Sequence, residues 1–191
     1  MTPRELMAKT SQAFDSIELR HFVTGSMASM AYSEYRSTLD IDIVADVRYG
    51  DVPDLLAMFV PPEYYLSADA IREAMENTSQ FNIVHPASGL KIDVMVPDNS
   101  AFNASRFARV RRLEIGPGMV VPFASPEDVI LKKLVYFREG ASDKHTRDIA
   151  SLLKVVGADI DTAYIERWAQ TLAVEDLWAA IRARASGPPN V

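Results

Sequence analysis

The chain has 191 residues, of which 48% are hydrophobic and 24% charged, and its formal net charge is −6. This composition supports a packed core and excludes a largely disordered chain. Because it contains no cysteine, disulfides and cysteine-ligated zinc are excluded, and its acidity disfavours nonspecific coating of nucleic acid. No apolar run approaches the ~20 residues of a membrane helix, and the N-terminal residues lack a signal-peptide pattern. We therefore expect a cytoplasmic protein with no membrane partner.

Helices and strands are both predicted up to about residue 124. The spacing of apolar residues predicts helices over residues 3–14, 27–31, 53–59 and 68–76. Apolar and alternating runs predict strands over residues 21–24, 39–47, 64–66, 81–84, 90–96, 113–115 and 119–123. The loop 85–89 fits a hairpin, and Gly116-Pro117-Gly118 marks a second one.

From Ser125 onward only helices are predicted. Ser125 is a helix cap and Pro126 takes the first helical position. The helices are expected over residues 126–138, 143–156, 161–171 and 174–184. The predicted fold is therefore α+β: a mixed sheet flanked by helices over residues 1–124, a C-terminal helical bundle over 125–186, and a frayed tail over 187–191.

Three aspartates interrupt apolar strands. Asp40 and Asp42 leave the same strand face, with Cα atoms ~6.6 Å apart, although aspartate is a poor strand former. Two such carboxylates repel each other unless they share a cation, and hard oxygen ligands suit Mg²⁺. Placed beside Asp42, Asp93 would complete a site for two metal ions ~3.5–4 Å apart. The alternative is an exposed strand face with solvated acids.

A glycine turn at Gly25-Ser26 precedes these three acids in the sequence, and together they form an ordered series of motifs. Gly25 permits close approach of the backbone to phosphates, and Ser26 adds a hydroxyl. The series resembles the polymerase-beta-type nucleotidyltransferase superfamily, whose pattern is an apolar strand, Gly-Ser, an Asp-apolar-Asp pair and a later acid. The matching segments are Val23-Thr24-Gly25-Ser26, Thr38-Leu39-Asp40-Ile41-Asp42-Ile43 and Ile92-Asp93-Val94.

The resemblance implies a nucleotidyltransferase-type fold and transfer of a nucleoside monophosphate from an NTP, such as ATP, to an acceptor hydroxyl with release of pyrophosphate. It implies two Mg²⁺ ions, with Mn²⁺ as an alternative, bound by the three acids Asp40, Asp42 and Asp93. Asp93 would also help to activate the acceptor. Gly25 and Ser26 would hold the β and γ phosphates. Arg36 and Thr38 are further candidates for triphosphate binding.

The helical half resembles the abortive-infection-type toxin branch of that superfamily. The resemblance rests on Ser125-Pro126-Glu127-Asp128, Lys133-Leu134, Lys144, Asp148-Ile149 and Leu152-Leu153. It implies that Lys133 contacts the triphosphate and that Asp148 orients it, both as catalytic residues. His145 departs from the pattern, because the branch usually has an acid there.

The helical projection alone, without the family resemblance, predicts different environments for the neighbouring Lys132 and Lys133. Lys133 borders the apolar stripe of its helix, whereas Lys132 should face water. A Lys133–Asp148 contact is expected, either functional or as an interhelical ion pair worth little. His145 lies on the apolar stripe of the next helix and is expected to be a packed side chain.

The acceptor stays open at this stage. Four arginines at positions 106, 109, 111 and 112 lie in a segment without acids, which fits either an RNA contact or a solvated basic segment. The toxin branch suggests RNA, for example a tRNA end, within a toxin–antitoxin pair that includes a cognate antitoxin protein. The alternatives are a small-molecule acceptor of the antibiotic type, or a non-catalytic relative that binds nucleotide or protein.

Overall fold

The computed structural model describes residues 1–33, 38–140 and 142–185, which fall into two compact units. The first unit contains the described residues of 1–27 and 37–124, and the second contains those of 28–36 and 125–191. The second unit thus includes the segment that begins at Ala28.

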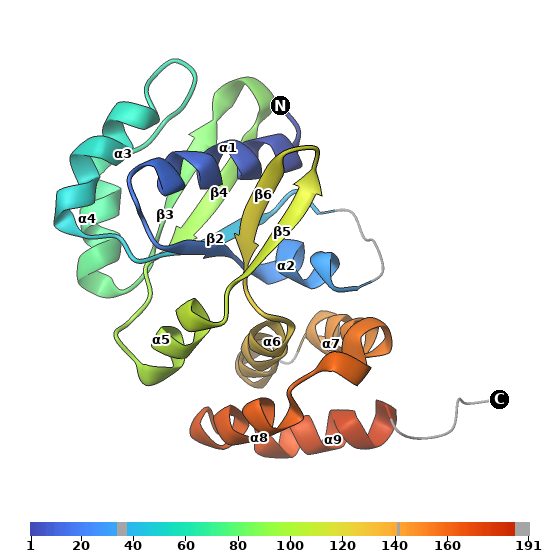
Figure 1. Cartoon of the computed structure of the whole chain (residues 1–191). Helices are drawn as coiled ribbons and strands as arrows, with labels where there is room; N and C mark the ends of the chain where they lie inside the picture. The colour runs from blue at the N-terminus through green and yellow to red at the C-terminus, as the bar shows by residue number, and fades with distance from the viewer. Residues whose placement is uncertain (34–37, 141, 186–191) are drawn as a thin grey trace. The chain divides into compact units, whose positions relative to one another are not determined.

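Six strands of the described chain form one mixed sheet, shown in Figure 1. They are β1 (His21–Val23), β2 (Ile41–Ala45), β3 (Gln80–His85), β4 (Leu90–Met95), β5 (Arg111–Gly116) and β6 (Met119–Phe123). Their order is β3-β4-β2-β1-β6-β5. The pairs β2–β4 and β1–β6 are parallel, and the remaining neighbours are antiparallel. The predicted α+β class with a mixed sheet is confirmed.

Helices of the first unit cover this sheet. They are α1 (Pro3–Ser16), the start of α2 (Gly25–Ala31), α3 (Val52–Met58), α4 (Ala68–Asn77) and α5 (Ala101–Ala108), with short 3-10 turns η1 (Tyr49–Asp51) and η2 (Pro86–Ser88). Helix α1 packs against β1, β4 and β6, while α4 packs against β3 (Figure 1). The core between these layers holds fully buried Phe14, Phe22, Ile43, Phe81 and Ile92. Burial of such side chains is the main stabilising contribution to the unit.

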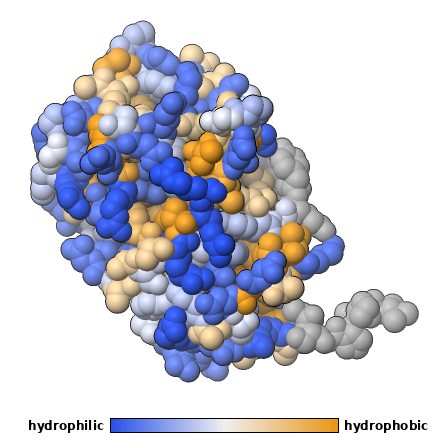
Figure 2. Space-filling view, viewed as in Figure 1, coloured by the Kyte–Doolittle hydropathy of each residue, from blue (hydrophilic) through white to orange (hydrophobic). Residues whose placement is uncertain are grey.

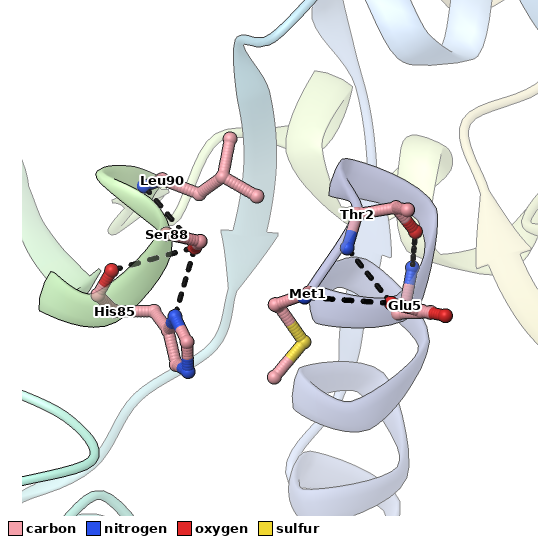
Figure 3. A network of polar contacts seen from close by, with 6 residues as sticks. All are labelled: Met1, Thr2, Glu5, His85, Ser88 and Leu90. Carbon is pink, nitrogen blue, oxygen red and sulfur yellow. Dashed lines mark hydrogen bonds and ion pairs between the residues drawn. The ribbon is translucent and has the colours of Figure 1, made fainter.

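Local polar contacts fix the start of α1 and the turn between β3 and β4 (Figure 3). At the start of α1, the Thr2 hydroxyl accepts from the Glu5 amide at 3.2 Å, and the Glu5 carboxylate accepts from the Thr2 amide at 2.8 Å. This capping box satisfies two helix-end donors. Between β3 and β4, the Ser88 hydroxyl lies 2.8 Å from His85 Nδ1 and accepts from the Leu90 amide at 3.4 Å. The turn therefore sets the antiparallel register that follows.

The second unit is helical from Ser125 onward. Its helices are α6 (Pro126–Gly140), α7 (Asp143–Val156), α8 (Thr162–Thr171) and α9 (Glu175–Ala185), with the 3-10 turn η3 (Gly157–Asp159). Helix α6 packs against α7 and α8, and α9 packs against α7 and α8. The Ser125 hydroxyl accepts from the Asp128 amide at 3.2 Å and donates to its carboxylate at 2.7 Å, as expected for a cap. Asp128 is buried and also accepts from the Tyr164 hydroxyl at 2.7 Å, which ties α6 to α8.

The structure lacks one predicted strand and contains one helix that was not predicted. Residues 64–66 do not form a strand, because only Tyr65 makes a bridge, to Val84. Helix α5 was not predicted at all. Among the described residues, no helix is both long and apolar enough to cross a membrane. The face shown in Figure 2 is largely hydrophilic, with apolar colour in separate areas, as is ordinary for a surface in water.

Candidate functional site

Two of the three predicted acids are neighbours across the centre of the sheet. Asp42 in β2 is the register partner of Asp93 in β4, and parallel strands lie ~4.8 Å apart. On the other face of β2, Ile41 and Ile43 are buried in the core. The alternation of apolar and acidic residues therefore points both carboxylates away from the core, from two strands held by the same ladder.

The third acid comes directly before β2. Asp40 is exposed, and its amide donates to the Thr38 hydroxyl at 3.3 Å, so Thr38 helps to fix the chain at the entry to the strand. Extending the β2–β4 register by one residue from the Ile41–Ile92 pair places Asp40 beside Lys91. On this face of the sheet, the Asp40 carboxylate thus lies beside the Lys91 ammonium, and the next pair along the strands is the Asp42 and Asp93 carboxylates.

A lysine and an asparagine hold Asp93. The Lys91 ammonium donates to both carboxylate oxygens of Asp93, at 2.8 and 2.9 Å. Asn82, the register partner of Asp93 in β3, donates its side-chain amide to Oδ1. The hydrogen bond with Asp93 raises the pKa of Lys91, and the charges of Asp93, Asp40 and Asp42 raise it further, which places all three acids within electrostatic reach of one ammonium. Sequence reasoning missed both residues, although Lys91 stands two positions before Asp93 and so shares its strand face.

Gly25 closes the site from the end of β1. The Thr24 amide donates to the Asp42 carbonyl at 2.9 Å, so the chain leaves β1 directly beside that acid. Gly25 has φ +62°, in the left-handed region, and a β-carbon there would stand 2.0 Å from Asp42 Oδ2. Glycine is therefore required by backbone conformation and by space. Ser26, which follows, is buried at the start of α2.

The donor set suits a hard divalent cation, although these side chains are not arranged around a common point. Among the described residues, no three acidic or histidine side chains are close enough to hold an ion together. Asp93 faces a cation nonetheless, because the Lys91 ammonium takes that place. Carboxylate oxygens are the ligands that Mg²⁺ and Mn²⁺ prefer. The acids therefore fit such an ion by the chemistry of their oxygen donors.

The arginine segment does not form one exposed basic face. Arg106 is buried, lies 4.8 Å from the centroid of the Phe22 ring and donates to the Asn103 side chain at 2.9 Å. Arg112 is exposed and forms an ion pair with Asp15 at 3.2 Å. One of the four arginines thus belongs to the packing of α5 against the sheet, and another is neutralised locally.

Within the second unit, the expected lysine–aspartate contact is present. Lys133 of α6 donates to the Asp148 carboxylate of α7 at 2.6 Å, and the two side chains are only 6% and 14% exposed. Lys132 was expected in water but is half-buried, with its ammonium 4.7 Å from the centroid of the Tyr136 ring. His145 is also half-buried beside that ring, and burial followed by the charge of Lys133 lowers its pKa. Arg36 lies outside the described residues.

Comparison of the sequence with family models and with curated proteins finds no match. Solved structures do match. An antigenic nucleotidyltransferase-like protein from Paracoccidioides brasiliensis superimposes with a TM-score of 0.54 at 17% identity, over 95% of this chain and 92% of that one. The antibiotic-resistance factor ANT(2'')-Ia gives a TM-score of 0.50 at 17% identity, over 95% of this chain and 91% of that one.

The chain has a nucleotidyltransferase-type fold. At this identity the likeness concerns the fold, and it carries no statement about the abortive-infection branch.

Proposed function

We propose that this protein is a metal-dependent nucleotidyltransferase that transfers a nucleoside monophosphate from an NTP to an acceptor hydroxyl. The observation that carries the proposal is the contact of three elements: Asp42 beside Asp93 across β2 and β4, with Gly25 against the Asp42 carboxylate. This arrangement lies within a nucleotidyltransferase-type fold. A glycine turn beside paired carboxylates is what phosphoryl transfer needs, since the backbone can approach phosphate while the acids hold its counter-cation.

Each residue of the first unit has a proposed part. Asp40, Asp42 and Asp93 would hold Mg²⁺ or Mn²⁺, which when bound neutralises charge on the phosphates and lowers the pKa of the attacking hydroxyl. Gly25 and Ser26 bind the β and γ phosphates of the NTP. The acceptor oxygen forms its bond to Pα as the bond from Pα to the β-phosphate oxygen breaks. Asp93 receives the hydroxyl proton, and pyrophosphate leaves.

Three further residues keep their proposed roles from the sequence resemblance. Thr38 contributes to triphosphate binding by fixing the chain before Asp40, which its contact with the Asp40 amide supports. A triphosphate contact by Lys133, oriented by Asp148, is supported by their short ion pair in the second unit. Thermal unfolding and NTP binding of Lys133 and Asp148 variants test this role.

For the acceptor, we favour a small hydroxyl compound over RNA. Of the four arginines that would mark an RNA surface, Arg106 is buried and Arg112 is paired with Asp15, which leaves Arg111 as the exposed one without such a pair among the described contacts. RNA binding needs a larger exposed positive charge. The fold likeness to an antibiotic-resistance factor points the same way. RNA transfer within a toxin–antitoxin pair is the second candidate, and non-catalytic binding of nucleotide or protein is the third.

Label transfer separates these three possibilities. The purified protein is incubated with each [α-³²P]NTP and Mg²⁺, together with total RNA, a panel of aminoglycosides, or a cytosolic protein extract. Label on a small compound supports the proposal, whereas label on RNA supports the toxin-like alternative. Asp42→Asn serves as the inactive control. Tight NTP binding without transfer to any acceptor, and with equal affinity in EDTA, would overturn the enzymatic proposal.

A further inference from the structure

The Lys91 ammonium lies at the Asp93 carboxylate in a position from which another cation can displace it. It contacts both oxygens of Asp93, yet its side chain is 53% exposed, against 19% for Asp93. A lysine on the open face of a strand can turn into water without uncovering the core. Asn82 contacts the same carboxylate from β3, through the shorter and stiffer asparagine side chain.

The two partners leave little room for an ion at Asp93. Each carboxylate oxygen offers about two acceptor positions. Oδ1 accepts from Asn82 and from Lys91, and Oδ2 accepts from Lys91. A divalent ion within bonding distance of Oδ2, about 2.1 Å for Mg²⁺, would stand close to the ammonium that lies 2.9 Å from that oxygen. The two positive charges repel each other, so binding of the ion favours departure of Lys91 from Asp93.

We propose that Lys91 is a positioning residue that occupies the cation place at Asp93 in the metal-free protein and yields it to a divalent ion. Asn82 keeps its hydrogen bond and preserves the carboxylate orientation during this exchange. Lys91 thereby compensates the mutual repulsion of Asp40, Asp42 and Asp93 before metal binds, and it lowers the affinity of the site for metal alone. This inference rests on the proposed function, because it concerns the same three carboxylates.

The direct test is binding of Mn²⁺ alone, followed by the electron paramagnetic resonance signal of the free ion. Lys91→Met keeps the length of the side chain and removes its charge. We expect it to bind Mn²⁺ about fivefold more tightly than the wild type, the scale of a half-exposed ion pair. Lys91→Gln should show the same direction, and Lys91→Arg, which keeps the charge, should stay close to the wild type. Lys9→Met changes the net charge equally at an exposed position of α1 and should leave the affinity unchanged.

The Asp93→Asn variant, used as a second background, shows whether Lys91 affects Mn²⁺ affinity through Asp93. In Asp93→Asn the carboxylate is absent, so adding Lys91→Met should give no further gain in Mn²⁺ affinity. Asn82→Ala should act with the opposite sign to Lys91→Met, weakening Mn²⁺ binding because Asp93 loses the contact that orients it. A general electrostatic effect of Lys91 would instead persist in the Asp93→Asn background.

The outcomes distinguish this inference from the proposed function. Equal or weaker Mn²⁺ binding by Lys91→Met, or a gain that persists with Asp93→Asn, overturns the role of Lys91 and leaves the metal site standing. Absence of Mn²⁺ binding in the wild type and in every variant overturns the metal site as well. A melting curve for each variant shows that it is folded, so a change in affinity reports on the site.

Discussion

Gly25 lies directly against Asp42, close enough that a β-carbon at residue 25 would stand 2.0 Å from the carboxylate oxygen Oδ2. The contact joins the end of β1 to the start of β2. It means that the position of one acid is set by the backbone of a neighbouring strand, in addition to its own ladder. A substitution at residue 25 therefore tests both the stability of the protein and the transfer activity.

Gly25→Ala should destabilise the protein and abolish transfer. The left-handed φ alone costs about 1–2 kcal/mol in a residue with a β-carbon, and displacement of Asp42 adds to this. A melting point lower by about 4 °C or more is expected. Gly118→Ala is the matched control, because Gly118 has φ +71° and nothing within 4 Å of the added carbon. If both variants lose equal stability, the contact with Asp42 contributes nothing.

Asp42→Asn should separate stability from activity. The amide has the shape of the carboxylate, and its neutrality relieves repulsion from Asp40 and Asp93 in the metal-free protein. The melting point without metal should stay level or rise, by about 2–4 °C for each kcal/mol gained. Transfer should be lost, since an amide is a poor bridge between metal ions. An unfolded variant, together with a wild-type melting point that Mg²⁺ never shifts, would make the acids structural.

Asp148→Asn should destabilise the second unit. The change takes the carboxylate from a lysine whose side chain is 6% exposed, and removing one partner of a buried pair costs about 3–5 kcal/mol. Glu166→Gln is the matched control, because its pair with Arg182 in the same unit is about half-exposed, and such pairs contribute about 1 kcal/mol or less. Thermal unfolding monitored by circular dichroism compares them. Equal small losses would show that burial adds nothing to the Lys133–Asp148 pair.

That variant also addresses the role of Lys133 in binding. Lys133→Met and Asp148→Asn should both weaken NTP binding if the lysine contacts the triphosphate, and calorimetry below the melting point measures this. A structural pair predicts lost stability with unchanged NTP affinity in the folded protein. The two readouts are independent, so each interpretation can fail separately.

The stability of the first unit should fall as the pH is lowered below about 6.5. Burial lowers the pKa of His21, whose ring contacts the Ser11 hydroxyl and the Leu19 carbonyl, both at 2.8 Å. The unfolded chain, with a histidine pKa of ~6.5, then binds the proton more readily than the folded one. This contribution is complete above the unfolded pKa and is lost as the pH falls through the lowered folded pKa.

His21→Asn should therefore reduce the difference in melting point between about pH 7.5 and pH 5.5, whatever its effect on the absolute value. His145 contributes with the same sign because its pKa is also lowered, so the double variant with His145→Asn should be the flattest. An undiminished difference in His21→Asn would show that other groups carry the acid sensitivity.

Much of the fold was predictable because most elements have a clean local signal. The alternation in 39–47 contains β2, and the turn 85–89 joins β3 and β4 as expected. Helix α5 escaped because its buried side is made by Phe102 and Arg106. A buried arginine that stacks on an aromatic ring looks in the sequence like a surface charge, so the apolar period of the helix was hidden.

The acids of the site could be predicted from the sequence, whereas the residues that contact them, Lys91 and Asn82, could not. The residue pattern placed Asp42 and Asp93 on strands, but the parallel register that makes them neighbours joins strands with β3 between them in the sequence. Sequence spacing alone does not determine such a register. The role of Lys91 escaped for a related reason. A lysine two residues from an acid is commonplace on an exposed strand, and only the register of Asp93 with Asp42 and Asn82 shows which charges lie near Lys91.

The β2–β4 pairing also bears on how the chain reaches its native state. The hairpins β3–β4 and β5–β6 join segments close in sequence, whereas Ile41 and Ile92, about fifty positions apart, must meet for β2 and β4 to pair. Closing so long a loop costs more entropy and is slower than forming a hairpin. The two acids of the proposed centre are therefore assembled by one of the least local contacts of the sheet. A nascent chain that has not yet emerged beyond β4 lacks the acid pair, so any competence for nucleotide can arise only after Met95 has been synthesised.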